Sequence, residues 1–137
     1  MPLVSRSLAS LQVMGDDLDP DAVTARLDCQ PTHSHAKGEV IARQVKVPLR
    51  TAPSGMWSLA AAETTPADVD GQVTWLLDQT TTDLEAWAWI GERYRLRVFC
   101  GWFMDHLTEG VTLSAPTLER LGQRGILLDI DLYGPGD

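Results

Sequence analysis

Hydrophobic and polar residues alternate along five stretches of the chain, and such alternation is typical of β-strands with one buried face. In the first stretch, Ala9, Leu11 and Val13 fall on one side and polar residues fall on the other. The second and third stretches flank the turn Pro53-Ser54-Gly55 and are predicted to pair as a hairpin. The five predicted strands cover residues 8–14, 39–49, 56–61, 94–100 and 126–133.

Capping residues predict where helices begin between these strands. Asp19 can cap a short helix, and the proline that follows it suits the first helical position. A second helix is predicted to begin at Thr65-Pro66-Ala67-Asp68, with Thr65 as its cap, and to extend to Gly91. It is interrupted at the three threonines 80–82, of which Thr82 is predicted to cap the new start. A third helix begins at Ser114, which is again followed by a proline in the first turn.

The element order is therefore β-α-β-β-α-β-α-β. Its first six elements match the split βαβ arrangement of ferredoxin-like sheets, and one helix and one strand are appended. We expect a single α+β domain over residues 1–137, with a mainly antiparallel sheet and the helices on one face. The stretches 29–38 and 101–110 are predicted to be loops.

Alternation also predicts a contact between two of the strands. Arg95 and Arg97 share the polar face of one strand, and Asp129 and Asp131 share the polar face of the last. If the two strands lie close together in the sheet, these side chains are expected to form cross-strand ion pairs.

Several short motifs occur in one order along the chain. They comprise Gly15-Asp16-Asp17-Leu18-Asp19-Pro20, Pro31-Thr32-x-Ser34-His35-x-Lys37-Gly38, Gly55-Met56-Trp57-Ser58-Leu59, and Leu113-Ser114 with Leu128-Asp129-Ile130-Asp131-Leu132-Tyr133-Gly134. In these motifs the chain resembles, over nearly its whole length, the bacterial domain-of-unknown-function family numbered 4279. The resemblance implies a compact bacterial α+β domain, and it brings no established catalytic residues.

Charge narrows the classes of partner. The 137 residues include 19 acidic and 11 basic side chains, which gives a net charge of −8. Nucleic-acid binding needs clustered lysine and arginine, so we expect no nucleic acid as a partner. An acidic surface also repels anionic membranes and favours encounters with basic proteins.

The chain has features of a cytoplasmic protein. Its two cysteines, Cys29 and Cys100, are too few to suggest a disulfide framework. No run approaches the ~18 apolar residues of a membrane span, and the first residues contain no apolar signal-peptide core. We therefore expect a protein of a reducing compartment, without membrane contact.

Two clusters of metal-ligating residue types do not match the spacing of metal sites. The aspartates of residues 17–21 alternate as in a calcium loop, but Ala22 stands where that loop requires glycine. Cys29, His33 and His35 have the chemistry of zinc ligands, but no fourth ligand lies near them in the sequence. We expect no bound metal and no cofactor.

The polar stretch before Gly38 is the candidate for a ligand site. It brings imidazole, hydroxyl and ammonium groups together. The carboxylates of Asp16 and Asp17, which follow the first predicted strand, could complete a ligand site with them. Such a set could bind a small ligand, could supply acid–base chemistry, or could be an ordinary surface loop. The candidate residues are His33, Ser34, His35, Lys37, Asp16 and Asp17.

Tryptophan is unusually frequent, with five residues against two phenylalanines and two tyrosines. Trp57 and Trp87 fall on apolar faces and are predicted to lie in the core. Trp75, Trp89 and Trp102 do not fit the apolar stripes of their segments and are candidates for a partner interface. Alternatively, the last strand and the loop before the third helix bury them within one chain.

These features favour a non-enzymatic protein-interaction module, which either self-associates or neutralises a basic partner. The competing hypothesis is an enzyme or a small-ligand-binding protein centred on residues 33–37. A deep pocket lined by those residues together with Asp16 or Asp17 would favour the second hypothesis. A flat apolar patch holding Trp75, Trp89 or Trp102 would favour the first.

Overall fold

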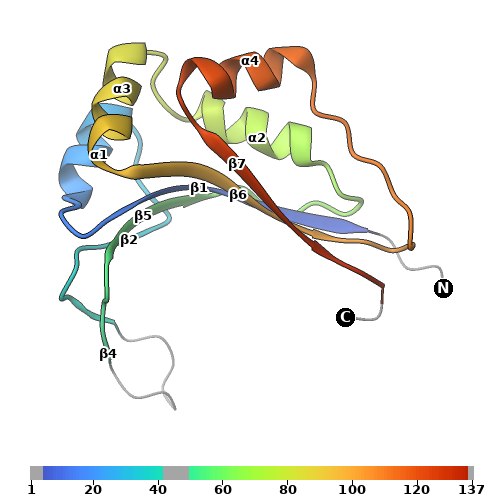
Figure 1. Ribbon diagram of the computed structural model, residues 1–137, viewed down its shortest axis with the longest axis horizontal. Helices are drawn as coiled ribbons and strands as arrows, with labels where there is room; N and C mark the ends of the chain where they lie inside the picture. The colour runs from blue at the N-terminus through green and yellow to red at the C-terminus, as the bar shows by residue number, and fades with distance from the viewer. Residues whose placement is uncertain (1–4, 42–49, 136–137) are drawn as a thin grey trace.

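The structure is a computed structural model in which residues 5–41 and 50–135 are described (Figure 1). Within these ranges the chain forms four helices and seven strands. In chain order they are β1 (Arg6–Gly15), α1 (Pro20–Leu27), β2 (His33–His35), β3 (Val40–Ile41), β4 (Arg50–Thr51), β5 (Gly55–Ala60), α2 (Val69–Asp78), α3 (Leu84–Arg93), β6 (Arg95–Phe103), α4 (Ala115–Gln123) and β7 (Leu127–Tyr133). The fold is therefore α+β, as predicted.

Five of the described strands form one mixed sheet in the order β2-β5-β1-β6-β7. The central strand β1 is antiparallel to both of its neighbours, and the edge strand β7 is parallel to β6. Figure 1 shows the helices together on one face of this sheet, as predicted, and no described helix on the other face. We call this helix-free side the open face.

The sheet order differs from the ferredoxin-like order that the sequence predicted. Among the described residues, the predicted strand 39–49 contributes nothing to this sheet: β3 pairs with β4 in a separate two-stranded sheet, and residues 42–49 lie outside the described residues. β5 pairs instead with β2, which lies in a stretch predicted to be a loop. Alternation indicates an extended segment, but it does not specify the partner strand, because pairing depends on contacts distant in sequence.

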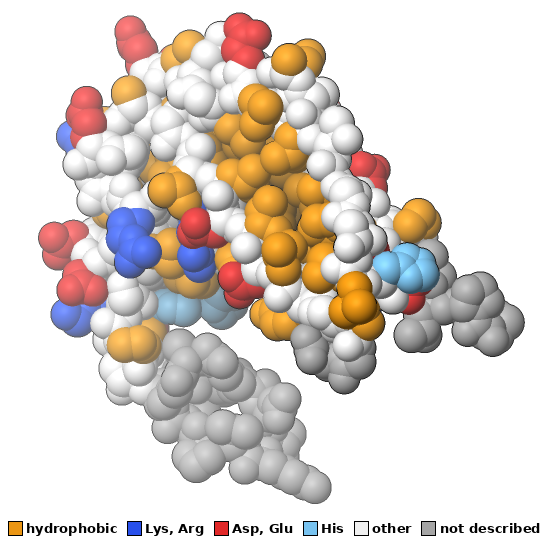
Figure 2. Space-filling view, turned by 45° about the vertical axis from the view of Figure 1, so that its right-hand side comes forward, with side chains coloured by type: hydrophobic (Ala, Val, Ile, Leu, Met, Phe, Trp, Pro, Cys, Tyr) orange, Lys and Arg blue, Asp and Glu red, His pale blue; other side chains and the backbone are white. Residues whose placement is uncertain are grey.

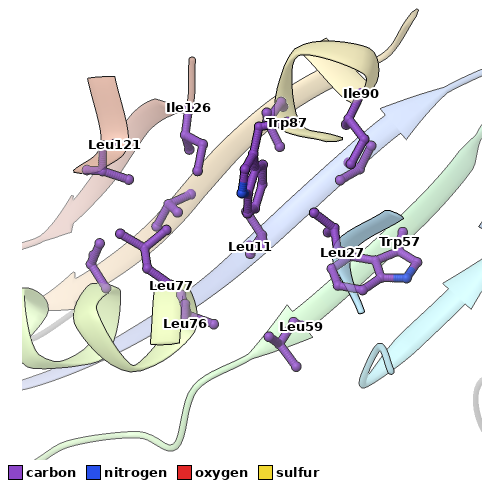
Figure 3. Packing of buried hydrophobic residues seen from close by; sticks show 14 of the residues in the cluster. Leu11, Leu27, Trp57, Leu59, Leu76, Leu77, Trp87, Ile90, Leu121 and Ile126 are labelled. Atoms are coloured by element: carbon purple, nitrogen blue, oxygen red, sulfur yellow. The ribbon is translucent and has the colours of Figure 1, made fainter. Parts of the chain in front are cut away.

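The hydrophobic core lies between the sheet and the helices. Trp57 of β5 and Trp87 of α3 are both buried there, which confirms the prediction for these two residues. Leu11, in the middle of β1, is fully buried in the same cluster. Figure 3 shows side chains from the helices and from the strands projecting into this one layer.

Capping residues set the helix boundaries much as predicted. Asp19 caps α1 and Ser114 caps α4, and in each case the side-chain oxygen accepts a backbone N–H of the first turn. The interruption predicted at residues 80–82 separates α2 from α3, but the caps of these two helices are Asp68 and Asp83, and the prediction of Thr65 and Thr82 as caps was wrong. These boundaries follow from contacts within one or two turns, so they can be predicted locally.

A carboxylate joins α2 to the beginning of α4. Asp70 Oδ1 accepts a hydrogen bond of 2.9 Å from the Ser114 N–H. This bond holds the pKa of Asp70 below its ordinary value of 3.8, although partial burial opposes it. Ionised Asp70 therefore stabilises the folded state above that ordinary value, and the contribution is lost as the pH falls through the lowered pKa.

We expect Asp70→Asn to remove the loss of folding stability that protonation of Asp70 causes at low pH. The variant should be less stable than the wild type at neutral pH, and its free energy of unfolding should fall less between about pH 4 and about pH 2. Urea unfolding at a series of pH values measures both effects, with Asp17→Asn as the control for loss of an exposed carboxylate. Equal acid dependence in Asp70→Asn and the wild type would contradict this role of Asp70.

Candidate functional site

The open face is formed by the strand residues that alternate with those of the core. Leu8 lies between the buried residues Ser7 and Ala9 of β1, and its side chain is 40% exposed. The strand registers place several such apolar side chains on neighbouring strands. They are Leu8 and Met14 of β1, Met56 of β5, Phe99 and Phe103 of β6, and Leu127 and Tyr133 of β7.

Aromatic rings and arginines pack together on the open face. The rings of Phe103 and Tyr133 stack with their centroids 4.6 Å apart, and the Arg6 guanidinium lies 3.7 Å from the centroid of the Phe103 ring. On β6, the Arg97 guanidinium lies 5.1 Å from the centroid of the Phe99 ring. Stacking and cation–π contacts of this kind stabilise one arrangement of flat side chains. The apolar groups here are thus positioned by contacts within the chain.

One of the predicted cross-strand ion pairs forms on this face. Arg97 Nη1 lies 3.0 Å from Asp129 Oδ2, which links β6 to β7. A pair between Arg95 and Asp131 does not form, because the residue opposite Asp131 on β6 is Gly101, about 20 Å along the strand from Arg95. The prediction is therefore confirmed for one pair and wrong for the other.

Charge on the open face differs from that of the whole chain. In the described strands, its charged side chains are those of Arg6, Arg95, Arg97, Asp129 and Asp131. The chain as a whole has 19 acidic and 11 basic residues. Most of the negative charge therefore lies outside these strands, on the helices and the connecting segments, from which Glu63 pairs with Arg6.

The strand β2 separates residues that were predicted to form one ligand site. His33 and His35 point to the open face, where His33 Nε2 and His35 Nδ1 lie 2.9 Å apart. Ser34 points to the opposite face, in register with the buried Trp57. This separation follows from the alternation of side chains along a strand. The predicted loop would have allowed all three side chains to converge.

The other predicted ligand residues lie at the surface nearby. Lys37 Nζ is 3.4 Å from Asp16 Oδ2 in an exposed ion pair, and Asp17 is exposed. A shallow hollow of about 390 Å³ opens beside the beginning of α1, and of the predicted set its lining includes Ser34 and His35. The lining residues are Leu18, Asp19, Pro20, Asp21, Ser34, His35, Ala36 and Glu39. The hollow is not the deep pocket that would favour an enzyme.

The described residues contain no group of three His, Cys, Asp or Glu side chains that could hold a metal ion. The half-buried Cys29 donates a hydrogen bond of 3.4 Å to the Gln30 carbonyl, and burial together with the charge of Asp28 raises the pKa of its thiol. Cys100 is buried in the core, and burial raises its pKa to about 11. Neither thiol is therefore poised as a thiolate, the form that attacks substrates and binds metals.

The three tryptophans that were candidates for an interface do not gather in one patch. Trp75, on α2, is 43% exposed. Trp89, on α3, is half-buried between the guanidiniums of Arg26 and Arg93, which lie 4.2 and 4.1 Å from its ring centroid. Trp102 lies in β6, which extends beyond its predicted end, and is 6% exposed. Of the three, Trp75 presents the most exposed ring.

Sequence reasoning missed the apolar residues of the open face. In β6, the positions that alternate with buried residues hold Arg95 and Arg97, but further along they hold Phe99 and Phe103. Aromatic side chains at positions that would otherwise face water indicate a contact surface. Phe99 lies within the predicted strand and already gives this signal, whereas Phe103 joins it only when the strand is known to extend beyond residue 100.

Among the described residues, no helix is long and apolar enough to span a membrane. No curated protein and no solved structure was found to match the chain. A family model described as Domain of unknown function (DUF4279) matches residues 5–135. Since the match extends over nearly the whole chain, in agreement with the order of its short motifs, this protein belongs to the DUF4279 family.

Proposed function

We propose that this domain is a non-enzymatic protein-interaction module and that it binds its partner on the open face of the sheet. The observation that carries the proposal is a sheet face without helix cover in the described part of the chain, on which apolar side chains are exposed. Leu8 of β1 and Tyr133 of β7 are both exposed on this face. Apolar side chains that are held in place by contacts within the chain, but are exposed to solvent, favour binding of another protein.

Charge supports a protein as the partner. The net charge of −8 favours encounters with a basic protein at long range, because such attraction raises the association rate, whereas the open face itself carries three arginines and two aspartates. Arginine is enriched at protein interfaces, where its flat guanidinium can stack and can pair with carboxylates. Arg95 offers such a group at an exposed position of the open face.

The cysteines support a reducing compartment. Cys29 and Cys100 are both free, and free thiols persist where glutathione and thioredoxin keep them reduced. We therefore place the module in the cytoplasm, and the motif resemblance supports a bacterial source.

The substitution Leu8→Glu is expected to abolish binding of the native partner. In affinity capture from the native host, the variant should recover less than about one tenth of the partner that the wild type recovers, because burying an unpaired carboxylate costs more than the ~1.4 kcal/mol of a tenfold loss. Trp75→Glu is the matched control, since it adds the same charge on α2 at a side chain that is 43% exposed, against 40% for Leu8. It should retain the partner.

Circular dichroism and urea unfolding establish that both variants fold. Sedimentation velocity then distinguishes a second copy of the chain from a different protein, because Leu8→Glu should convert a dimer to monomers. Loss of the partner in Trp75→Glu, with retention in Leu8→Glu, would move the binding site to α2 and contradict the proposal.

The hollow beside α1 supports a second candidate function, which is binding of a small ligand. Asp19, Asp21 and Glu39 are among its lining residues, together with Ser34 and His35 of β2. These groups favour a small cationic or polar molecule. Titration with a panel of small amines, followed by the backbone NMR signals of Ser34 and His35, tests this candidate, and unchanged signals would exclude it for that class.

A further inference from the structure

The outer edge of β7 presents backbone hydrogen-bonding groups. The Tyr133 carbonyl accepts a hydrogen bond of 2.8 Å from the Met104 N–H, so the backbone groups of Tyr133 point toward β6. The N–H and C=O groups of successive residues point alternately to the two sides of a strand, so those of Leu128, Ile130 and Leu132 point away from β6. Among the described strands, β6 is the only neighbour of β7. These groups therefore lie at an open edge of the sheet.

The helix side of this edge is apolar. Leu128 and Ile130 pack partly against the core, and Leu132 is 59% exposed. These three side chains, which share the helix side of β7, are called the apolar band. Figure 2 shows hydrophobic side chains gathered over the middle of the face that it presents. A strand added to β7 would place every second side chain beside this band, where aliphatic groups are removed from water.

The open-face side of the same edge is acidic. Asp129 pairs with Arg97, whereas Asp131 lies opposite Gly101, which has no side chain to reach its carboxylate. Asp131 is exposed at the sheet edge. A strand on the outer side of β7 would place a side chain directly beside this carboxylate, and a cationic group there would pair with it.

The same aspartates argue against pairing of two β7 strands. A twofold antiparallel pair keeps residues of one face opposite each other, so an axis at Ile130 would place Asp129 opposite Asp131 of the second copy. Like charges directly opposite each other are destabilising, and charged edge strands are a common device against self-association. A basic strand of another protein therefore fits β7 better than a second copy of this chain.

We propose that β7 binds an extended segment of a partner protein as an additional strand of the sheet. Lysine or arginine of that segment lies beside Asp129 and Asp131, and its alternate aliphatic residues lie beside the apolar band. Backbone hydrogen bonds supply affinity and the alternate side chains supply specificity. The proposal rests on the proposed function and names the chemistry of the partner segment.

A peptide of seven residues, the length of β7, in which valine and lysine alternate, tests the proposal on the full chain. We expect its binding to slow amide hydrogen exchange at Leu128, Ile130 and Leu132, while the amides of Asp129 and Asp131, which already face β6, change little. The same peptide with glutamate in place of lysine should bind at least about tenfold more weakly, because attractive cross-strand pairs become repulsive.

Two charge reversals separate binding at β7 from general attraction to an acidic protein. Asp131→Lys changes the edge, and Glu92→Lys makes the same change of charge at an exposed position of α3. We expect the lysine peptide to bind Asp131→Lys at least about tenfold more weakly than the wild type, and Glu92→Lys within about twofold. Equal weakening in both variants, protection of amides outside β7, or no binding up to about 1 mM would overturn the proposal.

Capture of the native partner distinguishes this proposal from the proposed function. If Leu8→Glu loses the partner and Asp131→Lys retains it, the open-face module stands and the β7 site is overturned. If Asp131→Lys loses the partner and Leu8→Glu retains it, the β7 site stands and the open face is not the binding surface.

Discussion

Replacing Trp57 with alanine is expected to lower the free energy of unfolding by about 3–5 kcal/mol. The side chain is fully buried in β5, and its Nε1 donates a hydrogen bond of 3.0 Å to Thr24 Oγ1 of α1. Alanine leaves a cavity between the sheet and α1 and also removes that donor. The loss is a large share of the roughly 5–15 kcal/mol by which domains are stable, and urea unfolding followed by circular dichroism measures it.

Two milder variants separate the packing of Trp57 from its hydrogen bond. Trp57→Phe keeps most of the ring volume but lacks the donor, and Thr24→Val removes the acceptor with little change of shape. Each is expected to cost about 1–2 kcal/mol, which is less than the alanine substitution. An alanine variant as stable as the wild type would contradict the burial of Trp57 in the core.

Replacing Gln72 with methionine is expected to lower the free energy of unfolding by about 1–3 kcal/mol. Gln72 of α2 is 2% exposed, and its amide nitrogen donates to the carbonyls of Ser7 and Ala62 at 2.8 and 2.9 Å. Its oxygen accepts a hydrogen bond of 2.7 Å from the Ser7 hydroxyl. Methionine has a similar length and fills the same space, so the loss reports the hydrogen bonds. Contacts of Thr64 with Ser7 persist and limit the effect.

A double-mutant cycle with Ser7→Ala tests whether the network acts as one unit. We expect a coupling energy above about 0.5 kcal/mol, because the two side chains are directly hydrogen-bonded. Gln79→Met is the control, since it makes the same substitution at an exposed position just after α2, where the change should stay within about 0.5 kcal/mol. Equal effects at the two glutamines would show that the buried network adds no stability.

The candidate site was predicted less accurately from the sequence than the fold was. His33, Ser34 and His35 were expected to act together on a loop, but pairing with β5 turns their side chains to opposite faces. A strand of three residues is too short to show a period of its own. Its extended conformation depends on hydrogen bonds to β5, and the sequence of the segment does not reveal them.

Features that depend on near neighbours could be predicted from the sequence. Asp19 and Ser114 cap their helices through N–H groups of the same turn, so their roles could be read locally. Trp57 and Trp87 lie in the core because each occupies the apolar side of its own element, a property that periodicity reveals.

Features that join distant segments depend on tertiary contacts and could not be predicted in this way. Gln72 is a polar helix residue by its sequence, and it is buried because Ser7, 65 residues away, completes its hydrogen bonds. The sheet order was decided in the same way, since strands of similar pattern compete for the same partners. Alternation marks one side of each strand as apolar, but only the packing of the helices decides which face of the sheet they cover and which face stays open for a partner.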